Sequence, residues 1–131
     1  MKGSKKNIEF HYDLGNDFYS LWLDKTMSYS SGIFCEENSL IKSQSNKYQR
    51  ILDQINKNGS QILEIGCGWG GFIKEANNKG YNVKGLTLSH EQKAYSEQLI
   101  KNNELNANIA LQDYRLEKGK FDNIVSIEMF E

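Results

Sequence analysis

Ile62-Leu63-Glu64-Ile65-Gly66-Cys67-Gly68-Trp69-Gly70-Gly71 joins a short apolar run to a turn that is rich in glycine. A short apolar run bounded by glycines is typical of a buried strand. Glycine permits positive φ and close approach of the backbone to a ligand. The turn also leads into a helical pattern, whose N-terminus offers free amides and the positive end of a dipole. These residues therefore predict a strand, a tight turn and a helix, with a place for a charged or strongly polar ligand at the turn.

Outward from this turn, the residues after Gly59 alternate between short apolar runs and helical patterns. We expect strands at 61–65, 82–86, 108–111 and 122–127, and helices at 71–78 and 90–102. Gly80 would end the first helix, and Ser89 with Gln92 has the S-x-x-Q spacing of a capping box at the start of the second. Short strands separated by helices imply right-handed crossovers and a parallel sheet that is covered on both faces.

Before Gly59, the spacing of apolar residues predicts amphipathic helices at 16–23 and 39–57, the second closed by Gly59. Their apolar faces need a partner surface, and the residues on them are Phe18, Leu21 and Trp22 in the first helix and Ile41, Tyr48, Ile51, Leu52 and Ile55 in the second. We expect Phe18 and Trp22 to be core residues, because an aromatic stripe at helical spacing is usually buried.

The composition excludes several classes of protein. The net charge is −1 and the Lys and Arg residues are dispersed, so nucleic-acid binding is not expected. Cys35 and Cys67 lie far apart without a histidine at ligand spacing, so we expect no metal site and no disulfide, as in a reducing cytosol. No apolar run reaches the about 18 residues of a membrane span, so any membrane contact would be peripheral. The lysines near the start would be a solvated terminus or a contact with an anionic bilayer.

The glycine spacing by itself fits two classes of cofactor. Residues 66–71 match the dinucleotide pattern G-x-G-x-x-G, whereas Glu64 with the glycines that follow gives the E-x-G-x-G-x-G form that is usual in S-adenosylmethionine enzymes. An NAD protein should present Asp or Glu about 20 residues further on, and this chain has Leu86-Thr87-Leu88 there. The residues thus favour S-adenosylmethionine, with a turn that binds no ligand as the alternative.

Motifs along nearly the whole chain resemble those of the cyclopropane-fatty-acyl-phospholipid synthase and mycolic acid cyclopropane synthase family. They are His11-Tyr12-Asp13-Leu14-Gly15-Asn16-Asp17-Phe18-Tyr19, Met27-Ser28-Tyr29-Ser30-Ser31-Gly32-Ile33-Phe34, the glycine turn with Trp69, Gly85-Leu86-Thr87-Leu88-Ser89 with Gln92, and Phe121-Asp122-Asn123-Ile124-Val125-Ser126-Ile127-Glu128-Met129-Phe130-Glu131.

The resemblance implies an α/β fold with a Rossmann-like class I methyltransferase sheet, truncated after about four strands, and N-terminal helices. Residues 1–58 would form a helical extension that is part of the cofactor lid, and residues 59–131 the first half of the S-adenosylmethionine-binding domain. Because the last strand lacks a covering helix, we expect the chain to be an N-terminal fragment. The resemblance implies that later partner residues and most of the lipid pocket are missing, so the chain would be inactive alone.

The resemblance also implies roles for individual residues in cofactor binding. Tyr29 and Ser30 would hold the methionine end, Glu64, Gly66, Gly68 and Gly70 would lie beneath it, Thr87 and Gln92 would reach the ribose, and Tyr114 and Arg115 would flank the adenine. Core packing for Tyr29, helix capping for Gln92 and a solvated charge for Arg115 remain alternatives. For Asp113, an adenine contact and a turn are equally open, and His11 is either a packed or solvated residue or a contact with cofactor or substrate.

For the chemistry, the resemblance implies transfer of a methyl or methylene carbon to the double bond of unsaturated phospholipid acyl chains, by a cytoplasmic protein in peripheral contact with the inner face of the membrane. Bicarbonate would act as the base, held by side chains that include Glu131. Ser31 stands where the family commonly has Cys, as a further bicarbonate contact, which keeps simple methylation open. A small-molecule amine N-methyltransferase and a non-catalytic S-adenosylmethionine-binding fragment are the alternatives.

Overall fold

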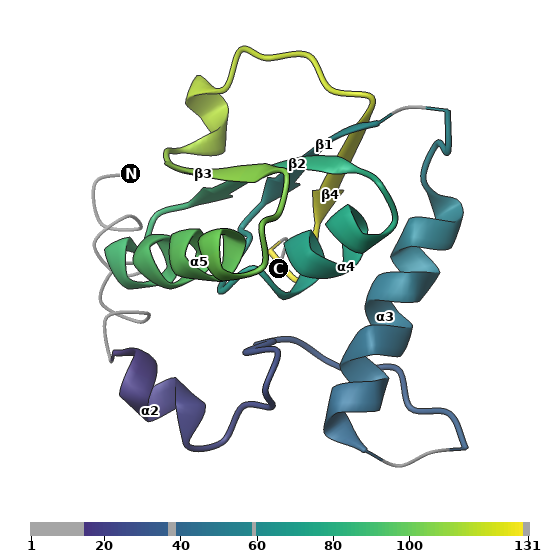
Figure 1. Ribbon diagram of the computed structural model, residues 1–131, viewed down its shortest axis with the longest axis vertical. Helices are drawn as coiled ribbons and strands as arrows, with labels where there is room; N and C mark the ends of the chain where they lie inside the picture. Colours follow the sequence, from purple (N-terminus) through teal and green to yellow (C-terminus); the bar gives the residue numbers. More distant parts are fainter. Residues whose placement is uncertain (1–14, 37–38, 59, 130–131) are drawn as a thin grey trace.

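The computed structural model describes residues 15–36, 39–58 and 60–129 (Figure 1). Its centre is a parallel sheet whose strand order is β3-β2-β1-β4. The strands are β1 (Gln61–Ile65), β2 (Asn82–Thr87), β3 (Ala107–Leu111) and β4 (Asn123–Ser126). Each agrees with its predicted position to within a residue at either end. Because the strand order reverses between β1 and β4, the carboxyl ends of these strands flank a crevice of the kind in which α/β sheets bind ligands.

The helices are α2 (Asn16–Ser20), α3 (Leu40–Gln54), α4 (Gly71–Asn78) and α5 (His90–Asn102), with a 3₁₀ turn η1 at Tyr114–Leu116. The predictions for α4 and α5 are confirmed at both ends, whereas α2 and α3 are shorter than predicted. Gly80, with φ of +89°, follows α4 as expected, because the left-handed conformation that ends a helix suits glycine.

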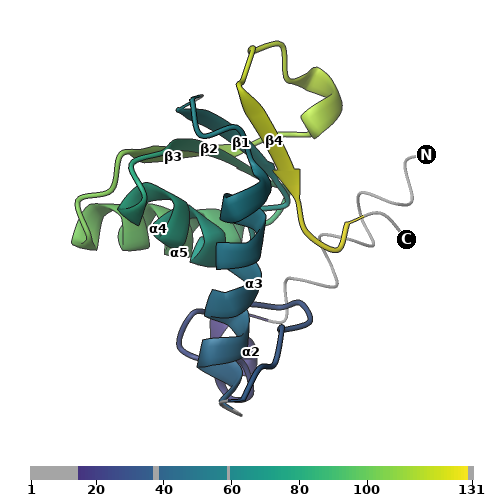
Figure 2. The ribbon, with the colours of Figure 1, turned by 90° about the vertical axis from the view of Figure 1, so that its right-hand side faces the viewer.

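The helices α3, α4 and α5 lie on one side of the sheet (Figures 1 and 2). Between them and the sheet lies the main apolar core, formed by Tyr48, Leu52, Ile62, Cys67, Phe72, Ile73, Ala76, Val83, Ile109 and Val125. This core includes residues from both sides of the predicted boundary at 58/59. The division of the chain into 1–58 and 59–131 stays a prediction.

The expected cover on both faces of the sheet is incomplete in the described residues, where the helices α3, α4 and α5 lie on one side only. On the side away from α4 and α5 runs the connection between β3 and β4, and Glu117 in it pairs with Lys84 of β2 at 2.7 Å. Ile124 of β4 is 65 % exposed there. The connection covers this face in part, because Leu63 of β1, the register partner of Lys84, is 4 % exposed.

The predicted apolar face of the first N-terminal helix is wrong, whereas that of the second is confirmed except at its first residue. Phe18 and Trp22 are about half exposed, and Tyr19 is buried in their place, in a small cluster with Met27 and Trp69. Phe18 lies in α2 and Trp22 in the turn that follows it, and α2 packs through the side that carries Tyr19. In α3, Ile41 is exposed.

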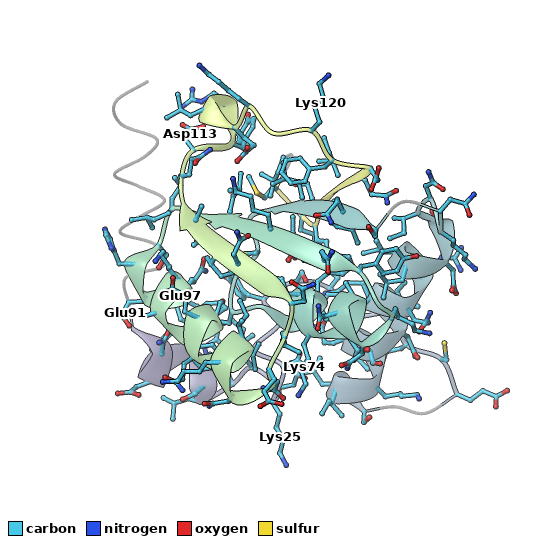
Figure 3. All side chains as sticks on the ribbon, turned by 45° about the horizontal axis from the view of Figure 1, so that its top comes forward. Lys25, Lys74, Glu91, Glu97, Asp113 and Lys120 are labelled. Carbon is cyan, nitrogen blue, oxygen red and sulfur yellow. The ribbon has the colours of Figure 1, made fainter. Side chains whose placement is uncertain are left out.

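The surface charges are dispersed, as the composition suggested. Lys25 and Lys120 project into solvent at opposite ends of the molecule (Figure 3). Lys93 and Glu97 form an exposed ion pair one turn apart on α5. Within the part of the chain that the structure describes, no helix is long and apolar enough to cross a bilayer.

Candidate cofactor site

A cleft of about 1110 Å³ opens at the carboxyl ends of β1, β2 and β4. Pockets for small ligands usually measure about 300–1,000 Å³, so the cleft has room for a cofactor and part of a second molecule. Its walls come from the segment after α2, from α3, from the glycine turn, and from the residues that follow β2, β3 and β4. The crevice expected from the strand order is therefore a real cavity.

The floor of the cleft is the turn between β1 and α4. Gly66, Gly68 and Gly70 have φ values of +75°, +53° and +88°, a region that glycine enters without strain. A Cβ built on Gly66 would lie 2.2 Å from Met129 Sδ, whereas one on Gly68 would meet no atom within 4 Å. The bare backbone of the turn thus lets other groups approach closely, and its open side at Gly68 faces the cleft.

At the carboxyl end of β2, a small hydrogen-bond network fixes Thr87 and Gln92. The Thr87 hydroxyl donates to Gln92 Oε1 at 2.7 Å and accepts from Ser89 N at 3.1 Å. Ser89 Oγ caps α5 by accepting from Gln92 N, as predicted, but the Gln92 side chain does not return to Ser89 as a complete capping box requires. Because its carbonyl oxygen is engaged by Thr87, Gln92 offers the cleft its amide donors.

After β3, the residues Asp113, Tyr114 and Arg115 form the rim of the cleft. The Asp113 carboxylate accepts from Arg115 N at 3.0 Å and from Arg115 Nε at 2.9 Å, and so begins η1. Asp113 therefore makes a turn and lines the cleft at once. The Arg115 guanidinium is paired with Asp113 and is not a lone solvated charge.

Aromatic rings form one side of the cleft. Tyr19 lies 4.8 Å from Trp69 and 5.6 Å from Tyr29, measured between ring centroids, and Trp22 lies 5.2 Å from Tyr29. Trp69 Nε1 donates to Asn16 Oδ1 at 2.7 Å, which attaches α2 to the glycine turn. Trp22, Tyr29 and Trp69 line the cleft, and aromatic faces of this kind attract cations.

Glu64, the last residue but one of β1, places a buried carboxyl group under the cleft. Its side chain is 3 % exposed, and Oε2 has no hydrogen-bond partner in the described residues. Burial raises the pKa of Glu64 well above its ordinary value, an effect that the nearby Lys47 ammonium opposes. A buried oxygen without a hydrogen-bond partner lowers the stability of the folded protein, unless a ligand in the cavity donates a hydrogen bond to it.

The segment 26–33 forms a second wall, which we call the N-terminal wall. It has no regular secondary structure and lies across the first turns of α3, where Ile33 N donates to Ser43 O at 3.0 Å. At the far end of the cleft, Ser31 N donates to Glu128 Oε1 at 2.8 Å. Glu128 has φ of +50°, an uncommon value for a residue other than glycine that often marks a functional position.

The predicted cofactor residues line the cleft, with one exception. The residues on the cleft surface are Tyr29, Ser30, Glu64, Gly66, Gly68, Thr87, Gln92, Tyr114 and Arg115. Gly70 lies instead under α5, where a Cβ would stand 3.0 Å from Leu99 Cδ2. Ser31 is exposed and is not among the lining residues, while Glu131 and His11 lie outside the described residues. The roles of all these residues in binding stay predictions.

Sequence reasoning gave no role to several residues of the cleft. Gln44 of α3 and Glu128 after β4 line it without any predicted role, and Tyr48, predicted only as part of an apolar helix face, lines it too. A polar residue at an inward position of an amphipathic helix, as at Gln44, is a signal that could have been read. Glu128 carries no such signal, because its position depends on the backbone conformation after β4.

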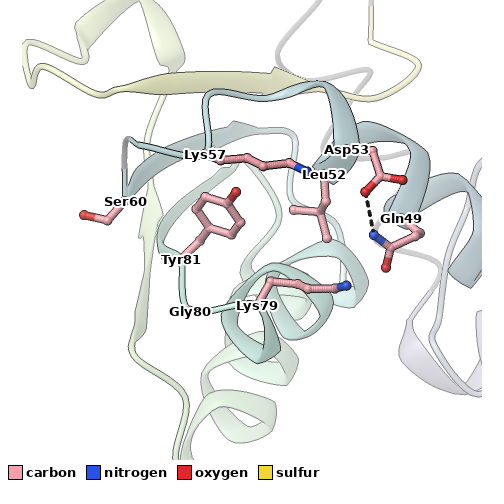
Figure 4. A pocket seen from close by; sticks show the side chains of 8 residues that line it. All are labelled: Gln49, Leu52, Asp53, Lys57, Ser60, Lys79, Gly80 and Tyr81. Atoms are coloured by element: carbon pink, nitrogen blue, oxygen red, sulfur yellow. Dashed lines mark hydrogen bonds between the residues drawn. The ribbon is translucent and has the colours of Figure 1, made fainter.

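A second hollow of about 350 Å³ lies at the opposite edge of the sheet, before β1 and β2 (Figure 4). Lys57, Lys79 and Tyr81 line it, and Gln49 donates to Asp53 beside it at 3.0 Å. Ligands of α/β sheets bind at the carboxyl ends of strands, and this hollow lies at the amino ends. The cleft above the glycine turn is therefore the candidate site.

Comparison with known proteins agrees with this geometry. A sequence model of the family described as mycolic acid cyclopropane synthetase matches residues 1–131. A probable fatty acid methyltransferase of Pseudomonas putida is 41 % identical in an alignment of 132 residues, and the match covers 95 % of this chain and 33 % of that protein. The cyclopropane-fatty-acyl-phospholipid synthase of Escherichia coli (strain K12) is 41 % identical in an alignment of 123 residues, and the match covers 92 % of this chain and 32 % of that protein.

Among solved structures, the mycolic acid cyclopropane synthase CmaA1, complexed with SAH and CTAB, superimposes with a TM-score of 0.87 at 35 % identity, covering 94 % of this chain and 45 % of that one. This confirms the α/β, Rossmann-like class I methyltransferase fold. The chain spans about a third of the length of the curated relatives it matches. With the family model matched along its whole length, the chain belongs to the mycolic acid cyclopropane synthetase family.

Proposed function

We propose that the protein binds S-adenosylmethionine in the cleft above the glycine turn. The observation that carries this proposal is the left-handed turn Gly66–Gly70 at the carboxyl end of β1, beneath a cavity of cofactor size. The related CmaA1 was solved with SAH, the product that remains after the methyl group has left.

The residues present suit this cofactor chemically. Its amino-acid end needs partners for an ammonium and a carboxylate, and the cleft offers the unpartnered Glu64 Oε2 and the Ser30 hydroxyl. Its ribose needs hydrogen-bond partners, which the Gln92 amide provides at the end of β2. Its sulfonium charge is favoured next to the aromatic rings of Trp22 and Tyr29.

We further propose that, within the complete enzyme, the acceptor is the double bond of an unsaturated phospholipid acyl chain. When bound, the cofactor supplies an activated methyl group, so the protein mainly has to align donor and acceptor. Trp22, Leu40 and Met129 line the cleft as large apolar side chains that are 48 %, 42 % and 42 % exposed, and they offer an apolar wall beside the donor. The names of the relatives, a fatty acid methyltransferase and a cyclopropane synthase, support a lipid acceptor.

The proton that leaves the transferred carbon requires a base near the acceptor. We retain bicarbonate for this step, held with the help of Glu131, as a proposal that rests on the resemblance alone. Ser31 directs its backbone amide to Glu128 and lies off the cleft surface, so its hydroxyl is a weaker candidate for this contact. Peripheral contact with the inner face of the membrane, from a cytoplasmic location, is likewise proposed from the nature of the acceptor.

Two measurements test the proposed function. Calorimetric titration of the purified protein with S-adenosylmethionine should show saturable binding, and absence of heat and of thermal stabilisation would contradict the cofactor assignment.

The second measurement concerns the acceptor. The protein produced from the complete reading frame, incubated with S-adenosylmethionine and vesicles of unsaturated phospholipid, should give acyl chains with a one-carbon mass gain. Hydrogenation of the product then separates the two outcomes, because a methylated alkene keeps its double bond and takes up hydrogen, whereas a cyclopropane ring has lost the double bond. A mass gain only on added amines would identify an amine methyltransferase, and cofactor binding without any product would identify a non-catalytic protein.

A further inference from the structure

The buried side of α3 is polar in its first turns. Ser43, Gln44 and Lys47 are 0 %, 2 % and 6 % exposed, and apolar packing begins only with Tyr48 and Leu52. Burying a lysine removes its ammonium from water, which costs several kcal/mol unless hydrogen bonds and opposite charges compensate. A polar inward face on an amphipathic helix therefore needs an explanation beyond packing.

These side chains hold a single residue of the N-terminal wall from two directions. Gln44 Nε2 donates to the carbonyl oxygen of Ser30 at 2.7 Å. Lys47 Nζ donates to Ser30 Oγ and to Gln44 Oε1. Gly32 lies so close to α3 that a Cβ on it would stand 2.1 Å from Ser43 Oγ. The backbone and the hydroxyl of Ser30 are both fixed by α3.

The direction of the hydrogen bond from Lys47 determines what Ser30 can offer. An ammonium has three donors and no acceptor, so Ser30 Oγ must accept from it. The hydroxyl hydrogen of Ser30 then points away from Lys47, and Ser30 lines the cleft whereas Lys47 does not. A hydroxyl that accepts from a cation is also a stronger donor, because the two hydrogen bonds polarise each other.

We propose that Lys47 is a positioning residue of the cofactor site, which fixes Ser30 as a hydrogen-bond donor toward the carboxylate of a bound amino-acid moiety. This inference rests on the proposed binding of S-adenosylmethionine. It adds the residue that makes Ser30 a donor, and not an acceptor, at the methionine end of the site. Lys47 acts through Ser30 and does not itself touch the ligand.

The charges around Lys47 fit this role. Burial lowers the pKa of Lys47, while the carboxylates of Glu128, Asp24 and Glu64 raise it, so acids from β1, from the N-terminal part and from the end of β4 all favour its charged form. A carboxylate at Ser30 would add one more negative group beside the ammonium. A purely structural lysine would not make the site distinguish a carboxylated ligand from one that lacks this group.

The test compares two ligands that differ only in that group, S-adenosylmethionine and decarboxylated S-adenosylmethionine. In Lys47→Met, affinity for S-adenosylmethionine should fall at least about tenfold, the size of one hydrogen bond to a charged group. Affinity for the decarboxylated ligand should stay nearly unchanged, so the preference between the two shrinks. Lys42→Met, on the exposed side of the same helix, should keep wild-type affinity for both.

A second variant guards against loss of folding. Lys47→Gln keeps an N–H donor without the charge, and it should show an intermediate preference, with circular dichroism as a check on the fold. Equal weakening of both ligands, or wild-type affinity for both, would overturn the role of Lys47. If the wild-type protein binds neither ligand, the proposed function itself fails and this inference with it.

Discussion

The glycine turn and the N-terminal wall enclose the same cleft but are built in opposite ways. The turn is set by local backbone conformation, with Gly66, Gly68 and Gly70 at positive φ between a strand and a helix. The wall has no helix or strand and is held by side chains of α3, such as Gln44, that lie more than ten residues away in the sequence. One part of the site can therefore be predicted from local sequence patterns, whereas the other part depends on contacts that only the folded chain makes.

The largest expected effect breaks the turn. Gly66→Val places a β-branched side chain at φ of +75° with its Cβ 2.2 Å from Met129 Sδ. Backbone strain alone costs about 1–3 kcal/mol, and we expect loss of stability and of cofactor affinity together. Chemical denaturation and calorimetry measure the two.

Gly80→Ala is the matched control for this change. Gly80 also has positive φ, at +89°, but a Cβ there meets nothing within 4 Å, and the site is far away. It should lose stability and keep its affinity. If both variants lose affinity equally, the loss follows from reduced stability alone, and the turn has no specific part in cofactor binding.

The second change tests the buried carboxyl group of Glu64 beneath the turn, through the pH dependence of the free energy of unfolding. Burial raises the pKa of Glu64 above the ordinary 4.5, so the folded state holds this proton more tightly than the unfolded state. The resulting stabilisation is present below pH 4.5 and is lost as the pH rises toward the folded-state pKa. Glu64→Gln should therefore be more stable than wild type near pH 8 and differ little below pH 4.5. If the free energies of unfolding of the wild type and of Glu64→Gln change with pH in parallel, this expectation is contradicted.

A third change weakens the wall. Gln44→Leu removes the donor to the Ser30 carbonyl and the acceptor for Lys47, and it leaves buried polar groups without partners. We expect a loss of about 1–3 kcal/mol in the free energy of unfolding, because such groups cannot reach water. Gln54→Leu, exposed at the end of α3, is the control and should change stability little. If both variants behave alike in denaturation, the wall does not depend on Gln44.

The smallest expected quantity is the coupling energy of the Trp69–Asn16 hydrogen bond, which joins the glycine turn to α2. Trp69→Phe keeps an aromatic ring beside Tyr19 but removes the donor to Asn16 Oδ1. One neutral hydrogen bond contributes about 0.5–1.5 kcal/mol. A double-mutant cycle with Asn16→Ala should recover a coupling energy of that size, and additive losses would show that the bond does not matter.

The same contrast explains how much the sequence predicted. The limits of α4 and the start of α5 were predicted correctly because glycines and Ser89 mark them locally, and parallel strands follow from the alternation of elements. The buried side of α2 was wrong because Phe18 and Tyr19 are both aromatic, and only the position of Trp69 decides which one turns inward. The exposure of Ile41 has a similar cause, since the N-terminal wall covers the polar side of α3 and not the apolar one.

The cleft residues divide in the same way. Thr87 and Gln92 lie on elements whose positions the pattern fixed, and the structure brings them to the cleft. Lys47 and Glu128 depend on tertiary contacts, with Ser30 and Ser31, that no spacing in the sequence encodes.

The aromatic side of the cleft gives the protein a built-in optical reporter. The chain has two tryptophans, Trp22 and Trp69, and both line the cleft. Trp69 is 2 % exposed and Trp22 is 48 % exposed, so their emission differs in wavelength, and only Trp22 is open to aqueous quenchers. Occupation of the site can therefore be followed by intrinsic fluorescence without a label, and the accessible component identifies which wall the ligand covers.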